Sequence, residues 1–173
     1  FSDGRNVLVF PMPSDTDLLK EVSLFQFLDD HERSDLAKQL ATVRFRAGEL
    51  VFQFGEPGDA LYVIQSGEAE VFFKNDMGER VVLEVARRGD FFGELSLLDN
   101  GCRSASVIAT QDLEALRLDR EQLQHFLQRR PQAAMDLLAA MGRRLRVSAG
   151  QLRRTATRNA NKEVEDQRSA VQR

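Results

Sequence analysis

Short segments with a two-residue hydrophobic period fill the middle of this chain and constrain its fold most strongly. Between Arg44 and Leu118, apolar and polar residues alternate, and turn-forming stretches such as Gly55-Glu56-Pro57-Gly58-Asp59 interrupt the pattern. Many short strands joined by tight turns are typical of an antiparallel sandwich or barrel. The pattern predicts β-strands at 42–46, 49–54, 60–65, 68–74, 80–86, 106–109 and 112–118.

The same alternation predicts which side chains fill the interior of the β domain. These residues are Val51, Phe52 or Phe54, Leu61, Val63, Val71, Phe73, Val82, Leu83 and Val85. Most of these residues should be core, and Val63, Val71, Leu83 and Val85 are the candidates to line a ligand cavity instead; the sequence does not separate the two groups.

Helical patterns flank the strands on both sides. Residues 15–43 predict short helices, one of them capped by Asp30, and Asp119 is expected to cap a helix over 120–128. Pro131 fits the first position of a longer helix. Apolar residues in that helix follow alternating steps of three and four, which is a short heptad pattern. It fits a helix packed on its own barrel and a helix paired with a second copy equally well. The residues at these steps are Leu138, Met141, Leu145, Ser148 and Leu152.

Composition excludes several classes of protein. The net charge of the 173 residues is −3, so nothing global points to nucleic acid. The single cysteine, Cys102, excludes a disulfide framework and suits a reducing compartment. It is either an incidental loop thiol or, beside Arg103, a redox-sensitive one. No run approaches the roughly 20 apolar residues of a membrane span. We expect a cytoplasmic location, or the cytosolic domain of a membrane-associated protein.

The chain divides into three predicted parts. Residues 1–14 are interpreted as a flexible or cloning-derived N-terminus. Residues 15–152 form the main domain with its C-terminal helix, and residues 153–173 form a polar helical extension or linker. The long helix is strongly basic, which indicates a solvated face or, as a sharper alternative, a surface for anionic lipid or nucleic acid.

The stretch at 91–107, FFGELSLLDNGCRSASV, carries the most specific chemistry. Gly93 allows close backbone approach, and a short helix starting at Glu94 would direct free N–H groups toward an anion. Arg103 can reach back across the loop and pair with that anion bidentately, assisted by the Ser104 hydroxyl. Glu94 can only accept, so it requires hydroxyl donors on the same ligand. An anion with an adjacent hydroxyl describes a sugar phosphate or a nucleotide. The alternative is a Glu–Arg ion pair that closes a surface loop without a ligand.

This stretch closely resembles the phosphate-binding cassette of the cyclic nucleotide-binding domain, and the turn glycines of 55–67 match the same family. The resemblance implies a jelly-roll barrel with N-terminal helices and a long C-terminal helix. It assigns the ribose 2′-hydroxyl to Glu94 and the cyclic phosphate to Arg103. Further contacts are implied for Gly93, Leu95, Ser104 and Ala105, and for barrel residues that include Val71 and Leu83.

The long helix resembles that of bacterial cyclic-AMP receptor regulators, in its Pro131 and in the Arg-Arg-Leu that ends at Leu145. This resemblance implies that Arg144 braces the cassette glutamate and that Ser148 contacts the adenine amino group. Ser148 as a neutral helix residue is the alternative. Ala149 replaces a hydroxyl residue that often serves the partner subunit's ligand in these regulators.

The resemblance implies a regulatory module that senses cyclic AMP and transmits binding through its long helix. Cyclic GMP stays open, because Ser104 could help hold guanine. The alternatives are the sensor half of a transcription regulator, the regulatory domain of a membrane protein, and a degenerate member that binds nothing. The expected partners are a second copy of the chain and an effector domain outside it, with no direct DNA binding.

An enzyme is not expected. A jelly-roll enzyme such as a cupin needs clustered metal ligands, usually several histidines and a carboxylate. The two histidines of this chain fall on predicted helices, far apart in sequence, and no nucleophile–base pair is visible. We therefore expect no catalytic residues, no metal site and no cofactor other than the nucleotide ligand.

Overall fold

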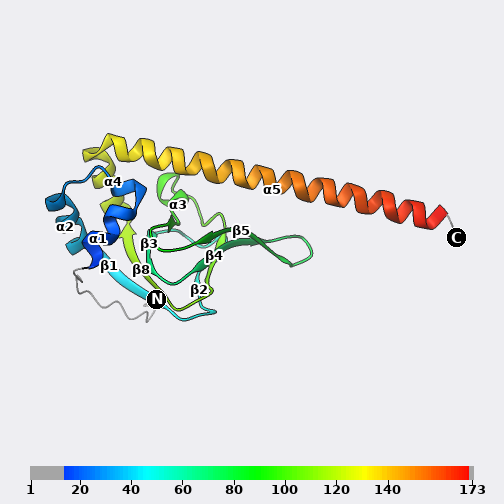
Figure 1. Cartoon of the computed structure of the whole chain (residues 1–173), viewed down its shortest axis with the longest axis horizontal. Coiled ribbons are helices and arrows are strands. Elements are labelled where there is room, and N and C mark those ends of the chain that lie inside the picture. Colours follow the sequence, from blue (N-terminus) through cyan, green and yellow to red (C-terminus); the bar gives the residue numbers. More distant parts are fainter. Residues whose placement is uncertain (1–13, 172–173) are drawn as a thin grey trace. The chain divides into compact units, whose positions relative to one another are not determined.

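The computed structural model describes residues 14–171 (Figure 1). The strands are β1 (Ala41–Phe45), β2 (Leu50–Phe52), β3 (Ala60–Ser66), β4 (Ala69–Lys74), β5 (Arg80–Ala86), β6 (Phe91–Phe92), β7 (Ser106–Ala109) and β8 (Leu113–Asp119). The helices are α1 (Ser14–Glu21), the single 3-10 turn η1 (Ser23–Phe25), α2 (Asp30–Gln39), α3 (Leu95–Leu98), α4 (Arg120–Arg129) and α5 (Pro131–Val171).

The strands form two antiparallel sheets of four strands each, with the orders β1-β8-β3-β6 and β2-β7-β4-β5. Strands that are distant in sequence pair within each sheet, as β1 does with β8 and β2 with β7. This confirms the expected fold class, mainly β with an antiparallel jelly-roll arrangement and flanking helices. The two sheets remain separate layers and do not join into one closed ring of strands.

An aromatic cluster occupies the space between the sheets. The ring centroids of Phe52 and Tyr62 lie 6.1 Å apart, those of Tyr62 and Phe92 lie 5.6 Å apart, and all three side chains are buried. Offset and edge-on contacts at such separations stabilise aromatic cores beyond simple area burial. The cluster therefore holds β2, β3 and β6 together. β6 leads directly into the loop predicted to bind the ligand.

The opposite face of β3 supports the helices. Leu61 pairs across the sheet with Leu118, and Val63 pairs with Leu116; all four side chains are fully buried, although none belongs to the cluster between the sheets. Phe25 of η1 contacts Phe126 of α4, with ring centroids 5.2 Å apart. A strand that is buried on both faces lacks the simple alternation of a half-exposed strand.

The predicted helix starts are confirmed in one case and corrected in another. Asp119 caps α4, as expected, by accepting from the Gln122 amide at 2.9 Å. The cap of α2 is Asp29, so the assignment to Asp30 was wrong. Asp29 accepts from the Glu32 amide at 2.8 Å, and Glu32 accepts from the Asp29 amide at 3.0 Å. This reciprocal capping box needs an acidic residue three positions after the cap, and the sequence meets that condition at Asp29.

Several predicted interior positions also require correction. Leu61 and Val63 are buried against the helices and not between the sheets, and Val71, Val82, Leu83 and Val85 are only partly buried.

Between Phe52 and Phe54, Phe52 is the buried residue, whereas Phe54 is 68% exposed. In β4, Phe72 is buried at 5% exposure and Phe73 is only partly buried, the reverse of the prediction. The pairing of β4 with β5 changes register between Val71 and Phe72. Such a bulge shifts the inward-facing parity along a strand.

The chain separates into two compact units, with the division after Asp136 inside α5. The first unit holds both sheets and the start of α5, where Ala133 is buried. The second unit is helical and begins at Leu137. The helix opens at Pro131, as predicted, and continues through the polar extension to Val171. No described helix is both long enough and apolar enough to cross a bilayer.

Candidate functional site

Arg103 is the centre of the candidate site. Arg103 lies in the loop that follows α3, and it is buried, with 4% of the residue exposed. Its Nη1 donates to the Gly93 carbonyl oxygen at 2.9 Å and to Ser96 Oγ at 3.0 Å. These two contacts fix one end of the guanidinium against the start of the same loop.

An aromatic floor supports the buried cation. The Arg103 Cζ lies 4.0 Å from the centroid of the Phe52 ring and 6.0 Å from that of Tyr62. A guanidinium is attracted by the negative face of such rings. The floor therefore offsets part of the cost of removing this charge from water.

The remaining edge of the guanidinium has a donor without a hydrogen-bond partner. Among residues 14–171, Arg103 Nε has no hydrogen-bond partner although it is buried. Nη2 lies 3.7 Å from the carboxylate of Asp59, which is 73% exposed. Nε–H and one Nη2–H point in the same direction, so this edge can bind two oxygens of an oxyanion at once.

The electrostatics keep Arg103 positively charged. Burial lowers the pKa of Arg103 below its ordinary value, and Tyr62, Asp59 and Glu56 oppose that shift by raising the pKa. Arginine remains protonated in proteins at neutral pH despite such shifts. The site therefore presents a permanent, partly desolvated positive charge with an unused hydrogen-bonding edge.

Two glycines make room for this arrangement. Gly93 has a φ of +88°, and a Cβ there would lie 2.8 Å from Arg103 Nη1 and 3.1 Å from the Ala60 carbonyl oxygen. A Cβ at Gly58 would lie 1.9 Å from Ser96 Oγ. A side chain at Gly93 would crowd the Arg103 guanidinium itself, and a side chain at Gly58 would displace Ser96, which holds it.

Main-chain contacts also join the loop between β2 and β3 to the Arg103 segment. The Gly55 amide donates to the Arg103 carbonyl at 2.9 Å, and the Arg103 amide donates to the Glu56 carbonyl at 2.8 Å. Pro57 and Cys102 form an isolated antiparallel bridge beside them. The backbone of Arg103 is therefore fixed as firmly as its side chain.

Glu94 lies on the same loop and is also buried, at 2% exposure. Its carbonyl oxygen accepts from the amides of Leu97 and Leu98 at 3.0 and 3.2 Å, which closes the single turn of α3. The Gly93 carbonyl that holds Arg103 immediately precedes Glu94. The structure thus places Glu94 and Arg103, the two residues predicted to bind the ligand, on one short loop that begins at β6.

The other predicted site residues fall in several environments. Leu95 is 37% exposed, Ala105 is buried at 8%, and Ser104 is exposed. Val71 and Leu83 are partly buried on the paired strands β4 and β5, at the register shift. Arg144 and Ser148 belong to α5 in the second unit, and their contacts with a ligand stay predictions.

The sequence did not predict several residues that hold Arg103. Ser96 falls inside the recognised motif, and Gly58 and Asp59 lie in the recognised turn, so their positions were visible although their contacts were not. Of the aromatic floor, Phe52 was predicted only as a possible core residue, and Tyr62 was not predicted. Arg120 gave no signal, because it reaches the loop from α4.

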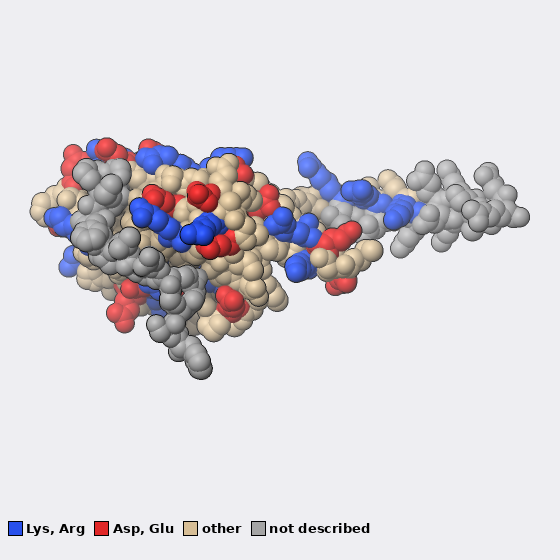
Figure 2. Space-filling model, turned by 90° about the horizontal axis from the view of Figure 1, so that it is seen from below, with Lys and Arg blue, Asp and Glu red and all other residues tan. Residues whose placement is uncertain are grey.

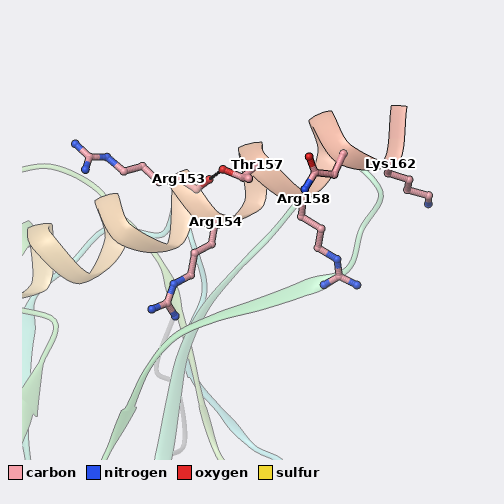
Figure 3. A pocket seen from close by; sticks show the side chains of 6 residues that line it. Arg153, Arg154, Thr157, Arg158 and Lys162 are labelled. Carbon is pink, nitrogen blue, oxygen red and sulfur yellow. Dashed lines mark hydrogen bonds between the residues drawn. The ribbon is translucent and has the colours of Figure 1, made fainter. Parts of the chain in front are cut away.

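A second notable surface lies on α5. Arg153, Arg154, Thr157, Arg158, Asn161 and Lys162 line a shallow hollow on the helix. Arg154 and Arg158 extend from the same side of the helix (Figure 3), and the space-filling view includes basic side chains along its described part (Figure 2). The sequence has no acidic residue between 137 and 162. This surface is the basic face expected from the sequence.

Within the described residues, no group of three or more His, Cys, Asp or Glu side chains is placed to hold a metal ion. Cys102 is exposed and is not in a disulfide. The chemistry that the described site supports is the binding of an oxyanion by a buried guanidinium.

Comparisons with known proteins identify the family of this domain. The family model of the cyclic nucleotide-binding domain matches residues 42–130, a range that includes Glu94 and Arg103. The chain therefore belongs to the cyclic nucleotide-binding domain family.

Three relatives illustrate the similarity. A cAMP-dependent protein kinase regulatory subunit of Aspergillus fumigatus is 43% identical over 109 residues, which are 63% of this chain and 26% of that protein. A CRP-like cAMP-activated global transcriptional regulator of Mycobacterium tuberculosis is 35% identical over 130 residues, or 75% of this chain and 58% of that protein. The crystal structure of the Thermus thermophilus catabolite activator protein superposes with a TM-score of 0.68 at 35% identity, covering 75% of this chain and 61% of that one. The chain thus spans only part of each relative.

Proposed function

We propose that this chain is a regulatory module that binds a cyclic nucleotide, with cyclic AMP as the preferred ligand. The observation that carries the proposal is the unused Nε–Nη2 edge of buried Arg103. A cyclic phosphate supplies two oxygens at the spacing that this edge can bind. Arg103 binds the phosphate, and Nη1 stays on Gly93 and Ser96.

Glu94 supplies the complementary half of the recognition. Its buried carboxylate accepts from the ribose 2′-hydroxyl, which a simple phosphate lacks. Main-chain and hydroxyl groups of Gly93, Leu95, Ser104 and Ala105 complete the loop around the ligand, and Val71 and Leu83 border the base or sugar. Arg144 and Ser148 are proposed to act from α5.

Cyclic AMP is preferred on the strength of the relatives. The names of the Aspergillus fumigatus kinase subunit and the Mycobacterium tuberculosis regulator both specify cAMP. Cyclic GMP is the competing ligand, because the Ser104 hydroxyl is exposed at the loop and free to meet a guanine. Comparing the two nucleotides on one sample decides between them.

The long helix is the proposed output of the module. Leu138, Leu145 and Leu152 are spaced by seven residues and are 58%, 71% and 64% exposed. A stripe with this spacing fits a second copy of the same helix. Ligand binding would then bias the position of α5 and pass a signal to an effector outside the binding module.

We also propose different functions for the two parts of the chain. Residues 15–152 act as the nucleotide-binding module, residues 153–173 connect it to the effector, and the site is reached from the cytoplasm. No catalytic role is assigned to any residue. The names of the relatives describe regulatory proteins.

The sensor half of a transcription regulator is a second candidate. The match of 130 residues to the Mycobacterium tuberculosis regulator favours it. The regulatory domain of a membrane protein is the other context. Reading the gene beyond codon 173 distinguishes them, because one predicts a DNA-binding domain and the other predicts apolar spans.

Equilibrium binding of the purified chain to cyclic AMP, cyclic GMP and inorganic phosphate tests the proposal. We expect saturable binding of a cyclic nucleotide at one site per chain and much weaker binding of phosphate, since phosphate does not use Glu94. Failure of both cyclic nucleotides to bind would overturn the proposed function.

A further inference from the structure

Arg120 makes an unusual set of contacts with the binding loop. It is the first residue of α4, immediately after the cap Asp119. Its Nη1 donates to the Leu97 carbonyl at 3.0 Å and also contacts Asn100 Oδ1. Its Nη2 donates to the Ser96 carbonyl at 3.0 Å and to the Gly58 carbonyl at 3.1 Å.

Helix electrostatics do not account for Arg120 at this position. The start of a helix carries a partial positive charge, which favours acidic rather than basic side chains. Glu121, in the same first turn, follows that preference. The Arg120 guanidinium instead complements the C-terminal end of α3, because carbonyl groups there lack partners within the helix.

The loop needs such a support after α3. That helix has only four residues, so it cannot hold itself together by its own hydrogen bonds. Asn100 then adopts a φ of +56°, and it is the only residue other than glycine with a positive φ in the described chain. Asparagine is one of the few residues besides glycine that adopt this conformation, which reverses the chain direction after α3. Arg120 contacts the side chain of Asn100 and the last carbonyls of α3, and so holds this turn in place.

Ser96 links Arg120 to Arg103. The Ser96 carbonyl accepts from Arg120, and the Ser96 hydroxyl lies 3.0 Å from Arg103 Nη1. Gly58 completes the connection, because its carbonyl accepts from Arg120 and its Cα packs against Ser96. The two arginines therefore hold opposite sides of the same residue.

We propose that Arg120 is a positioning residue that keeps the empty binding loop in its ligand-ready geometry. This inference rests on the proposed function. It adds a residue that touches no ligand but acts through Ser96 on Arg103. Preorganisation of this kind increases affinity, because less freedom is lost when the ligand binds.

The chemistry requires an arginine. A guanidinium presents donors at both ends of a rigid plane, which suits oxygens on two different segments. A lysine ammonium is a single point charge and can satisfy only part of this set. Arg120→Lys should therefore keep some of the effect, whereas Arg120→Met keeps the apolar stem and loses every donor.

The test combines ligand binding with amide hydrogen exchange of the ligand-free chain. Arg120→Met should weaken cyclic AMP binding roughly tenfold, the loss of about one charge-assisted contact. In the same variant, the Leu97 and Leu98 amides should exchange roughly tenfold faster, while the amides of β3 and β8 should not change. Arg120→Lys should fall between the parent and Arg120→Met in both measurements.

Arg44→Met is the matched control. Arg44 makes one exposed ion pair with Glu114, at 2.7 Å between Nε and Oε1, across the paired strands β1 and β8. It should leave both measurements unchanged. Unchanged affinity in Arg120→Met, or faster exchange spread evenly over the chain, would overturn the proposal.

The exchange measurement separates this proposal from the proposed function. It is made without ligand, so it reports on the loop even if the parent binds no cyclic nucleotide. In that case the proposed function fails, and the exchange of Leu97 and Leu98 still decides whether Arg120 holds the loop. If Arg120→Met does not fold, the Arg120→Lys variant carries both measurements.

Discussion

The carboxylate of Asp59 lies 3.7 Å from Nη2 of Arg103 and 2.7 Å from Nη2 of Arg117. Asp59 is mostly exposed, whereas the Arg103 side chain is not. The acid therefore stands at the solvent side of the edge proposed to receive the cyclic phosphate. A bound phosphate and this carboxylate would repel each other and compete for the same cation.

Asp59→Asn should accordingly tighten cyclic AMP binding. We expect a gain of roughly two- to fivefold at low salt, the size of an exposed ionic interaction, and a smaller gain at high salt. Calorimetric titration at two ionic strengths measures it. Asp76→Asn, in the turn between β4 and β5, removes an exposed carboxylate elsewhere and is the control. Weaker binding by Asp59→Asn would instead mean that Asp59 orients Arg103.

Gly58→Ala should damage the site sterically. Its Cβ would lie 1.9 Å from Ser96 Oγ and 2.3 Å from Ser96 Cβ, so the two loops must separate. Overpacking of this kind costs about 1–3 kcal/mol, and we expect lower affinity together with a lower melting temperature. Gly142→Ala in α5 meets no atom within 4 Å and should be neutral or stabilising. Parent-like affinity in Gly58→Ala would contradict the described packing.

Ser96→Ala should weaken binding without abolishing it. The substitution removes one of the two acceptors of Arg103 Nη1 and leaves the contact with the Gly93 carbonyl. A hydrogen bond of this type contributes about 0.5–1.5 kcal/mol, so we expect a loss of roughly two- to tenfold. Ser104→Ala, at an exposed hydroxyl in the same loop, should affect cyclic AMP less. The reverse order of effects would show that Ser104 rather than Ser96 supports the phosphate site.

The local chemistry of the loop was predictable from the sequence, because its residues are close together in the chain. Gly93, Glu94 and Arg103 lie within 11 positions of one another, and their spacing was sufficient to indicate an anion site. The turn glycines and the cap at Asp119 were predictable for the same reason. Each depends on local backbone geometry.

The remaining contacts depend on tertiary structure and were not predictable. The contact of Arg120 with Ser96 joins two segments that are 24 residues apart, and no pattern along the chain signals it. The burial of Phe72 instead of Phe73 follows from a shift in the pairing with β5. A two-residue strand such as β6 is too short to show a hydrophobic period.

Binding should not depend on the protonation of Arg103 near neutral pH. Burial lowers the Arg103 pKa, so the unfolded chain holds this proton more tightly than the folded chain does. Its contribution to stability therefore rises with pH only in the alkaline range between the folded-state and unfolded-state pKa values. We expect the affinity for cyclic AMP to be flat between about pH 6 and about pH 9 in this respect. If the affinity fell within that window as a single group titrated, a group other than Arg103 would have to bind the phosphate.

The most direct test of the central claim is calorimetric titration of cyclic AMP into the parent chain, Arg103→Ala, Arg103→Lys and the control Arg44→Ala. Loss of the charge-assisted contact in Arg103→Ala should cost about 1.5–3 kcal/mol, which is roughly 10- to 100-fold in affinity. Arg103→Lys should recover only part of this loss, because lysine keeps the charge without the two-donor edge. The control should match the parent. Equal affinity of Arg103→Ala and the parent would contradict the account, because the ligand would then not be held by the buried guanidinium.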